Sequence, residues 1–350
     1  MRTIFSLFLL LLFSFTAYAA TVSTPEDDDY AIIFTYHRFG ETKYPSTNIR
    51  LDQFKYQLDY LKEHNYNVLP LYKIVKMIQT GEKIPPKTVA ICMDDAYRTV
   101  YTNAYPMLKE RGFPFTVFVN TMPIIHKSKR YVTWDMLREM AQHGAYYASH
   151  TYSHAYLTQK KSENKEQWEK RVRMEVDKAD EKMRKELGNS VNEHPKMIAY
   201  PFGEYSLQLE ELLKSMDYVG ISQLSGPFGS NISLMRVPRF PMSETYATKK
   251  GFLLKLNTVP MPVASVTPEE TMLGKFNPPQ LRIKFKRALK GVVCYKSSGD
   301  KIDMKWINDK EVVIQSQTRL KLPRDHYTCT AKAEGNKWYW YSHLWVFRQR

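Results

Sequence analysis

Between residue 31 and about residue 262, runs of consecutive apolar residues alternate with stretches whose apolar residues recur at helical spacing. Consecutive apolar runs are typical of strands buried in a parallel sheet, and recurrence every three or four residues is typical of a helix that covers one. This alternation favours parallel β/α units, so we expect an α/β fold built as an incomplete or distorted (β/α) barrel. The strands are expected at residues 32–39, 88–92, 115–119, 197–200 and 218–223, and the helices at residues 54–61, 71–78, 101–111, 134–143 and 168–187.

The residues after about 262 follow a different pattern. Residues 281–285 and 302–306 alternate apolar with polar side chains, residues 312–314 and 337–345 are rich in β-forming residues, and no long amphipathic helix is evident. This pattern predicts a small antiparallel β domain built like a sandwich. We therefore expect two domains after the first twenty residues, a barrel domain over residues 21–265 and an all-β accessory domain over residues 266–350.

Aromatic residues gather near the end of the accessory domain, where Trp338, Tyr339, Trp340 and Tyr341 are consecutive and Trp345 follows. Such side chains can stack on sugar rings. They can equally fill the core of a sandwich, because alternate residues of a strand face inward. The sequence leaves both interpretations open.

Residues 1–20 have the features of a secretory signal. Arg2 is the only charged residue, residues 4–15 form an apolar core, and Ala17-Tyr18-Ala19 fits an A-x-A cleavage site. The apolar run is short for a transmembrane span, and no cysteine at the cleavage site could carry a lipid anchor. We therefore expect an exported chain, periplasmic or secreted, without a stable membrane anchor.

The chain of 350 residues carries a formal net charge of +15. Arg2 is the only charged residue of the signal segment, so nearly all of this charge remains after the segment is removed. Such an excess can suit nucleic acid, an anionic envelope or an anionic polymer, although a solvated basic surface is the default. An exported chain without a nucleic-acid motif favours the envelope or the polymer, so we expect no nucleic-acid partner. Composition does not fix the oligomeric state.

Three cysteines are present. Cys92 belongs to an apolar strand and is expected to be a buried thiol. Cys294 and Cys329 lie in β-rich stretches and can pair in an oxidising compartment. Cys92 is the competing partner, which we discount because it belongs to a buried strand of the other domain. We therefore predict a Cys294–Cys329 disulfide that staples the accessory domain.

Two short motifs carry the chemistry. Asp94 and Asp95 directly follow the strand at residues 88–92, and His150 and His154 are four residues apart. Adjacent residues at a strand end point in different directions, so one carboxylate can bind a cation while the other faces the substrate. Histidines at this spacing share one face of a helical turn and can chelate one ion. Three protein ligands leave a position for water, which is the arrangement of a hydrolytic metal site.

With these motifs the chain resembles the polysaccharide deacetylases, carbohydrate esterases that share a NodB-type domain. The family's first motif, T-F-D-D-G-Y, appears at residues 92–97 with Ala96 in place of glycine. Its second, H-[ST]-x-x-H, is complete at residues 150–154, and a third, a Pro-Tyr-Gly loop after a strand, appears at residues 199–205. The resemblance extends from about Ala31 to Pro262.

The resemblance implies a role for each motif residue. Asp95, His150 and His154 would bind one divalent metal ion, expected to be Zn²⁺, and Asp94 would be the general base. The loop formed by Pro201, Phe202 and Gly203, together with Tyr97, would contact the substrate and its oxyanion. The family's arginine that orients the base is best matched by Arg239, with Arg236 as the second choice.

One departure concerns the general acid. Most members end the domain with an L-x-H segment, and none occurs near residues 251–257. An early strand instead carries Tyr36-His37, which is similar to the branch that acts on poly-β-1,6-N-acetylglucosamine, where an N-terminal Tyr-His supplies the acid. His37 is therefore the expected acid, although a hydrogen-bonded residue at a strand end is the ordinary interpretation.

Together these features predict a metal-dependent N-deacetylase that acts on an N-acetylated amino-sugar polymer of the cell envelope or extracellular matrix. The alternative is a carbohydrate-binding protein on a catalytically decayed esterase barrel. An intact Asp94 argues against it, because a binding module does not need a free carboxylate beside the metal. A metallopeptidase is disfavoured because the chain lacks an HExxH helix.

Overall fold

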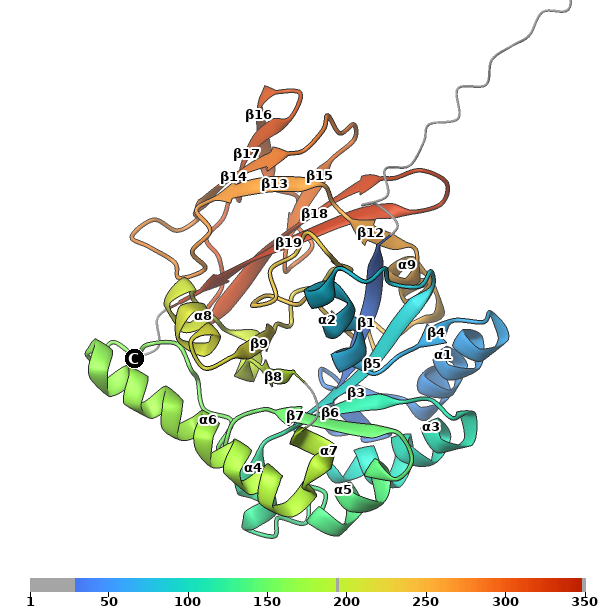
Figure 1. The fold of residues 1–350 in the computed structure, drawn as a ribbon. Coiled ribbons are helices and arrows are strands. Elements are labelled where there is room, and N and C mark those ends of the chain that lie inside the picture. Colours follow the sequence, from blue (N-terminus) through green and yellow to red (C-terminus); the bar gives the residue numbers. More distant parts are fainter. Residues whose placement is uncertain (1–28, 193–194, 348–350) are drawn as a thin grey trace, which may run out of the picture.

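One curved sheet with helices on its outside forms the larger part of the molecule (Figure 1). The computed structural model describes residues 29–192 and 195–347, and nine strands of these join in the order β10-β1-β5-β6-β7-β8-β9, with β11 beside β1 and β4 beside β5. All pairings are parallel except that of β10 with β1, which confirms the α/β class and the incomplete barrel. The strands are β1 (Tyr30–Tyr36), β4 (Asn67–Val68), β5 (Thr88–Asp94), β6 (Phe115–Val119), β7 (Ala145–Ser149), β8 (Lys196–Ala199), β9 (Tyr218–Ile221), β10 (Phe228–Gly229) and β11 (Phe240–Pro241).

The helices begin and end where local chemistry favours it. The side chain of Asn164 accepts a hydrogen bond from the backbone N–H of Gln167 and so caps α6 (Lys165–Leu187). Gly112 ends α3 (Tyr105–Arg111) in the left-handed conformation, with φ 65°. A small sheet of β2 (Arg38–Phe39) and β3 (Asn48–Ile49) precedes α1. The helices are α1 (Leu51–Glu63), α2 (Leu71–Thr80), the π-helical turn η2 (Val100–Ala104), α3 (Tyr105–Arg111), α4 (Thr121–Ile125), α5 (Trp134–Ala141), α6 (Lys165–Leu187), α7 (Asn189–Asn192), the 3-10 turn η3 (Pro201–Gly203), α8 (Leu207–Lys214) and α9 (Lys249–Leu256).

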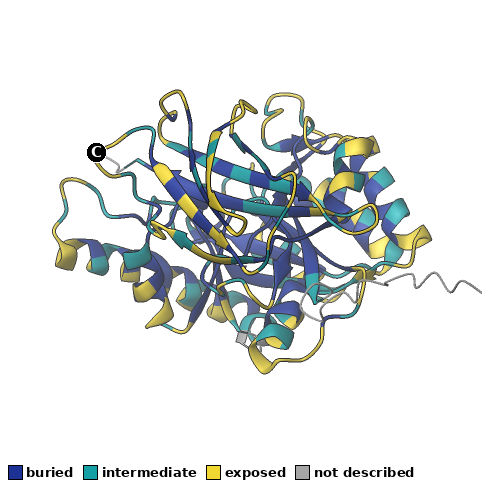
Figure 2. Ribbon diagram, turned by 90° about the horizontal axis from the view of Figure 1, so that it is seen from above, coloured by how far each residue is buried: buried dark blue, intermediate teal, exposed yellow. Residues whose placement is uncertain are grey.

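Strand β5 lies deep in this layered core. All seven of its residues are buried, and Figure 2 shows the buried strands enclosed by helices with exposed outer faces. Val89, Ile91 and Met93 pack in one hydrophobic cluster, whereas Ala90 and Cys92 pack in a second. Both faces of the strand are therefore covered, as its unbroken apolar run predicts. Cys92 is a free, buried cysteine.

The C-terminal strands form two four-stranded sheets that lie beside the curved sheet (Figure 1). One has the order β12-β19-β18-β15 and the other the order β13-β14-β17-β16. All pairings are antiparallel, as predicted, except that β12 runs parallel to β19. The strands are β12 (Thr258–Pro260), β13 (Val263–Thr267), β14 (Gln280–Phe285), β15 (Val293–Lys296), β16 (Asp303–Asn308), β17 (Glu311–Gln315), β18 (Arg324–Lys332) and β19 (Trp338–Val346).

The domain boundary expected between residues 265 and 266 falls inside β13, and the C-terminal sheets use residues from Thr258 onward. The C-terminal end of β19 packs against the barrel as well as within its own sheet, because Leu344 and Val346 share a hydrophobic cluster with Tyr200 and Tyr205. The two parts of the molecule thus share a continuous apolar contact.

The aromatic run of β19 serves several purposes. Tyr339 and Trp345 are buried in the core between the C-terminal sheets, whereas the Trp338 side chain is 39% exposed. Trp340 instead packs edge-on against Phe240 of β11, with ring centroids 5.4 Å apart. Core filling therefore accounts for part of the run, and Trp340 joins the C-terminal part to the barrel.

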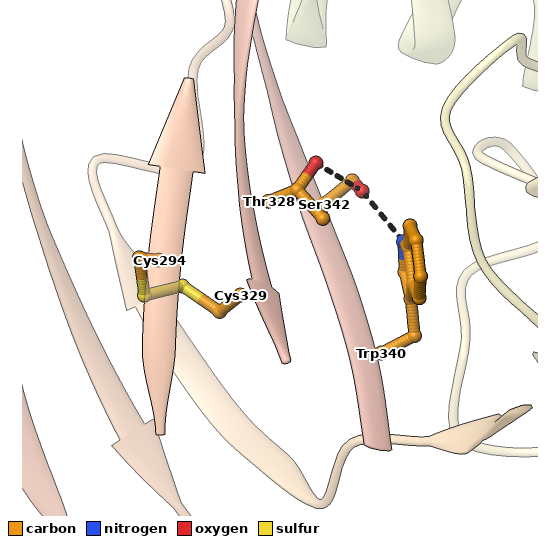
Figure 3. Close-up of a disulfide and its surroundings, with 5 residues drawn as sticks. All are labelled: Cys294, Thr328, Cys329, Trp340 and Ser342. Carbon is orange, nitrogen blue, oxygen red and sulfur yellow. Dashed lines mark hydrogen bonds between the residues drawn. A yellow bond between two sulfur atoms is a disulfide. The ribbon is translucent and has the colours of Figure 1, made fainter. Parts of the chain in front are cut away.

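Cys294 of β15 and Cys329 of β18 stand opposite each other and form a disulfide (Figure 3). Both residues are fully buried in the core between the two sheets. The bridge joins residues that are 35 positions apart in the sequence. The disulfide therefore ties β15, at the edge of this sheet, to β18, one of the two long strands at its centre.

Replacing both Cys294 and Cys329 by Ala is expected to lower the free energy of unfolding by about 3–4 kcal/mol, because the unfolded chain regains the entropy of a loop of this size. Denaturant unfolding of the parent and the double variant measures the change. Added reductant should weaken the parent and leave the variant unchanged. A bridge that includes Cys92 in non-reducing peptide maps would contradict the assignment.

In the described residues, no helix combines the length and the apolar character that crossing a membrane requires. The segment interpreted as a secretory signal, residues 1–20, lies outside the described residues.

Candidate active site

The two aspartates at the end of β5 separate into different environments. Asp94 is the last residue of the strand and is fully buried, and Asp95 follows it with φ 72°, in the left-handed region. Ala96 is also left-handed, with φ 53°, at the position where the resembling family has glycine. This turn directs the Asp94 carboxylate toward Arg239 and the Asp95 carboxylate toward the histidines.

His150 and His154 converge on Asp95. The Nε2 atom of His150 lies 3.5 Å from Asp95 Oδ1, and that of His154 lies 3.3 Å from the same oxygen. His150 Nδ1 is 2.9 Å from the carbonyl oxygen of Ala199, which can only accept, so Nδ1 carries the proton and Nε2 presents its lone pair. The imidazole is thus held in the tautomer that a metal ligand requires.

The prediction that the two histidines share a helical turn is wrong. Residues 150–154 form a loop in which Thr151 and His154 have φ 67° and 62°. The Thr151 hydroxyl accepts from the His154 backbone N–H, and buried Glu175 accepts from the backbone and hydroxyl of Ser153. Side chain-to-backbone hydrogen bonds replace the helical ladder here and still bring the two rings together.

The residues present fit a metal ion. Asp95, His150 and His154 each offer one ligand atom, and these atoms lie within 4.8 Å of one another. Among the described residues, His150 Nε2 has no hydrogen-bond partner although it is buried. A buried nitrogen left without a partner is costly, and a bound cation would satisfy it. Two imidazoles and one carboxylate are a donor set that suits Zn²⁺.

Arg239 holds Asp94 in a buried, two-pronged ion pair, with Nη1–Oδ1 and Nη2–Oδ2 distances of 2.7 and 2.9 Å. Its Nε donates to the carbonyl oxygen of Ser222, and its guanidinium lies over the ring of Phe118. Burial by itself would raise the pKa of Asp94, but the Arg239 guanidinium, the strongest opposing influence, helps lower it to about 2. The carboxylate therefore stays ionised at neutral pH.

Arg236, the second choice for this role, points elsewhere. It makes a two-pronged ion pair with Glu210, at 2.6 and 2.9 Å, and lies 3.7 Å from Glu269. Of the two arginines, only Arg239 contacts Asp94.

His37 follows β1 and lies near the Asp94 carboxylate. Its Nε2 atom lies 3.8 Å from Asp94 Oδ2, and its side chain is 16% exposed. The ring therefore stands beside the buried base and still reaches solvent, which a proton donor to a bound substrate needs.

The loop after β8 is strained and closely packed. Phe202 has φ 60° and Gly203 has φ 70°. A Cβ atom on Gly203 would lie 2.8 Å from the Cβ of Gln223, so both the backbone conformation and the space require glycine. The ring of Phe202 stacks on Tyr156, with centroids 4.1 Å apart, and meets His154 edge-on at 4.5 Å.

Tyr97 lines a cleft of about 580 Å³ over this site, together with Asp95, His154, Phe202 and Tyr131. Burial, and next the Asp95 carboxylate, raise the pKa of the Tyr97 hydroxyl, so it remains a hydrogen-bond donor. The structure thus gathers the predicted metal ligands, base, acid and loop at the carboxyl ends of the strands, with Arg239 reaching Asp94 from the residue before β11 and the cleft in front of the ligand residues.

Sequence reasoning missed three contributors. Gln223 donates to Asp94 Oδ2 at 3.3 Å, and its place at the end of an expected strand could have indicated it. Tyr156 supports Phe202 from a loop without a recognisable pattern. Arg324, at the start of β18, pairs with buried Glu204 at 3.0 Å beside the loop, and no local signal links residues 120 positions apart.

Comparison with known proteins identifies similar sequences and folds. Residues 81–221 match the family model described as polysaccharide deacetylase. The Bacillus subtilis (strain 168) protein YxkH, whose name places it among polysaccharide deacetylases, is 29% identical over 212 residues, 58% of this chain and 70% of that protein. The poly-β-1,6-N-acetyl-D-glucosamine N-deacetylase of Staphylococcus aureus (strain MRSA252) is 29% identical over 176 residues, 49% of this chain and 59% of that protein. The chain thus spans about three fifths of the length of the staphylococcal relative.

Solved structures share the fold. The Streptococcus pyogenes deacetylase PplD, in complex with acetate, superposes with a TM-score of 0.57 at 21% identity, over 65% of this chain and 98% of that chain. IcaB from Ammonifex degensii superposes with a TM-score of 0.53 at 20% identity, over 64% and 97%. Both matches leave about a third of this chain uncovered.

Proposed function

We propose that this chain, whose residues 81–221 match the polysaccharide deacetylase family model, removes acetyl groups from an N-acetylated amino-sugar polymer of the cell envelope or extracellular matrix, with one divalent metal ion, expected to be Zn²⁺. One observation carries the proposal: an ionised, buried Asp94 stands next to the three-ligand cluster without being part of it. Hydrolysis needs such a separate base, and a binding protein does not.

The ion would be held by Asp95, His150 and His154, where it would lower the pKa of water and withdraw electron density from the acetyl carbonyl. Asp94 accepts the proton of the attacking water as general base. Arg239 and Gln223 fix the direction of the Asp94 carboxylate, so that it is oriented before the substrate arrives.

The loop of η3 offers one donor for the negative charge that develops on the carbonyl oxygen. Pro201 has no backbone N–H, and those of Gly203 and Glu204 donate to the carbonyl oxygens of Tyr200 and Pro201. The Phe202 N–H is therefore the donor that we assign to the oxyanion. Tyr156, stacked on the Phe202 ring, holds it in place.

His37 supplies the second proton transfer. It protonates the amide nitrogen as the C–N bond breaks, which releases a free amine on the sugar and acetate. Without this proton the nitrogen would have to leave as an amide anion, which is a poor leaving group, so the C–N bond would break only slowly.

Acetate release from N-acetylated oligomers tests the proposal. Oligomers of β-1,6-linked N-acetylglucosamine, chitin oligomers and peptidoglycan are assayed side by side, each with and without a chelator. Chelator-sensitive release from one of them is expected, with restoration by added Zn²⁺. No release from any of the three would reject the function.

Replacing His37 by Ala is expected to lower turnover of an N-acetylated sugar by roughly 10²–10⁴-fold, because a general acid contributes about that much. An activated acetate ester needs no protonation of its leaving group, so its hydrolysis should change far less. The two rates are measured on the same preparation. Equal losses on both substrates would return His37 to a structural role.

We also propose that the protein works after export, in the periplasm or outside the cell. The signal-like segment at residues 1–20 and the disulfide in the C-terminal sheets support this location. Processing at Ala19 or Ala20, detected by N-terminal sequencing of the mature protein, tests it.

A further inference from the structure

A second cavity lies between the barrel and the C-terminal sheets, with a volume of about 320 Å³. The barrel contributes Arg236 and Pro238 to its lining, and the C-terminal part contributes Glu269, Trp340 and His343. None of the residues that line it also lines the cleft over the candidate active site. It is therefore a separate site, at the kind of junction where ligand pockets commonly form.

His343 brings an unsatisfied acceptor to this cavity. Its side chain is 96% buried, and its ring donates to the backbone carbonyl of Glu270. Nε2, the other nitrogen, has no hydrogen-bond partner within the described part of the chain. Burial, helped by Arg236, lowers the pKa of His343 to about 3, so the ring is neutral and Nε2 keeps its lone pair. A ligand hydroxyl or amide N–H would satisfy it.

Charged groups from both parts of the molecule meet at the same cavity. Arg236 is held by Glu210 and lies 3.7 Å from Glu269, whose side chain is 57% exposed. The Glu269 carboxylate can therefore accept further hydrogen bonds from a ligand while Arg236 keeps it near the cavity.

Trp340 adds a fixed aromatic wall. Its indole Nε1 donates to Ser342 Oγ, as Figure 3 shows, and that hydroxyl donates to the carbonyl oxygen of Ser225 in the barrel. Packing of the ring against Phe240 fixes it further. An aromatic ring held this way loses little side-chain entropy when a ligand packs against it.

We propose that this cavity binds one unit of the acetylated amino-sugar polymer. A sugar ring presents an apolar face to an aromatic wall, and its hydroxyl and amide groups are donors for His343 Nε2 and the Glu269 carboxylate. The proposal rests on the proposed function for its substrate class. It assigns the C-terminal part a role in holding the polymer away from the reacting acetyl group.

The test measures binding of a β-1,6-linked N-acetylglucosamine hexamer by calorimetry, in an Asp94→Asn background that keeps the hexamer intact. Glu269→Ala and His343→Phe are each expected to weaken binding about tenfold, the effect of losing one good hydrogen bond. Trp338→Ala is the matched control, because Trp338 belongs to the same strand and the same aromatic run but does not line the cavity. It should leave the affinity unchanged.

With Asp94 restored, the Glu269 variant should show about a tenfold higher KM for the hexamer and an unchanged KM for the dimer, with kcat unaffected. Glu269 is exposed, so its replacement tests the cavity even if His343→Phe fails to fold. A parent protein that does not bind the hexamer, or cavity variants that bind it as tightly as the parent, would overturn the proposal.

The two proposals fail in different ways. If hexamer binding depends on Glu269 and His343 but no acetate is released from any oligomer, the cavity stands and the deacetylase assignment falls. If acetate is released and the cavity variants keep the parent's hexamer affinity and KM, only the cavity assignment falls.

Discussion

Replacing Asp94 by Asn is expected to lower acetate release by roughly 10²–10⁴-fold, which is the usual contribution of a general base. The amide keeps the shape of the side chain and can still hydrogen bond with Gln223, but it cannot accept the proton of water. Because Asp94 lies outside the ligand cluster, the variant should bind as much metal as the parent. Elemental analysis and acetate release, measured on the same sample, check both statements.

His150→Ala is the matched comparison, because it removes a ligand and leaves the base. It should lose most of the bound metal together with activity. A metal-free Asp94→Asn protein would show that Asp94 is a ligand and that the roles of the two aspartates are reversed.

Removal of the Arg239 side chain is expected to have the largest effect on folding. In Arg239→Ala the Asp94 carboxylate would stay buried without its partner, and breaking such a pair costs roughly 3–5 kcal/mol. Urea unfolding at neutral pH measures this loss. Arg236→Ala is the control for activity, since its partner is Glu210 and not Asp94.

The same variant changes the pH dependence. Arg239 helps hold the pKa of Asp94 below its ordinary value of 3.8, at about 2, despite the opposing effect of burial. The stability that the ionised Asp94 carboxylate gives the folded protein is therefore fully present above pH 3.8 and is lost as the pH falls through about 2. Without Arg239 burial would raise the pKa of Asp94, so the acidic limb of the pH–rate profile should move upward. An unmoved limb in Arg239→Ala, with a shift in Arg236→Ala, would transfer the role to Arg236.

Much of the site could be predicted because its residues lie at the ends of strands. Asp94, Asp95 and His150 each follow or end an apolar run, and parallel strands bring their carboxyl ends to one edge of the sheet. The helical geometry expected for His150 and His154 was wrong, because Thr151 and Glu175 stabilise a loop through side-chain hydrogen bonds. Residue spacing alone does not distinguish a helical turn from such a loop.

Other parts depended on contacts that sequence does not show. Arg236 and Arg239 are separated by two residues, and only the pairing of Arg236 with Glu210 decides which one reaches Asp94. The aromatic run of β19 was open to two interpretations, and its residues turn out to have different surroundings. Tyr339 and Trp345 fill the core, whereas Trp340 lines a cavity. Alternation predicts which residues share a face, but not what lies opposite that face.

The attachment of the η3 loop has a consequence for the order in which the protein matures. Glu204 pairs with Arg324, and the Tyr205 carbonyl oxygen accepts from the Thr271 hydroxyl. The chain is synthesised from its amino end, so the ribosome has made every predicted metal ligand long before it reaches Arg324. The Phe202 N–H, the proposed oxyanion donor, therefore receives its last support only when β18 has been synthesised and has docked. An incomplete chain would carry the predicted metal ligands beside an unsupported loop, and the proposed activity would begin only once synthesis had reached the last strands.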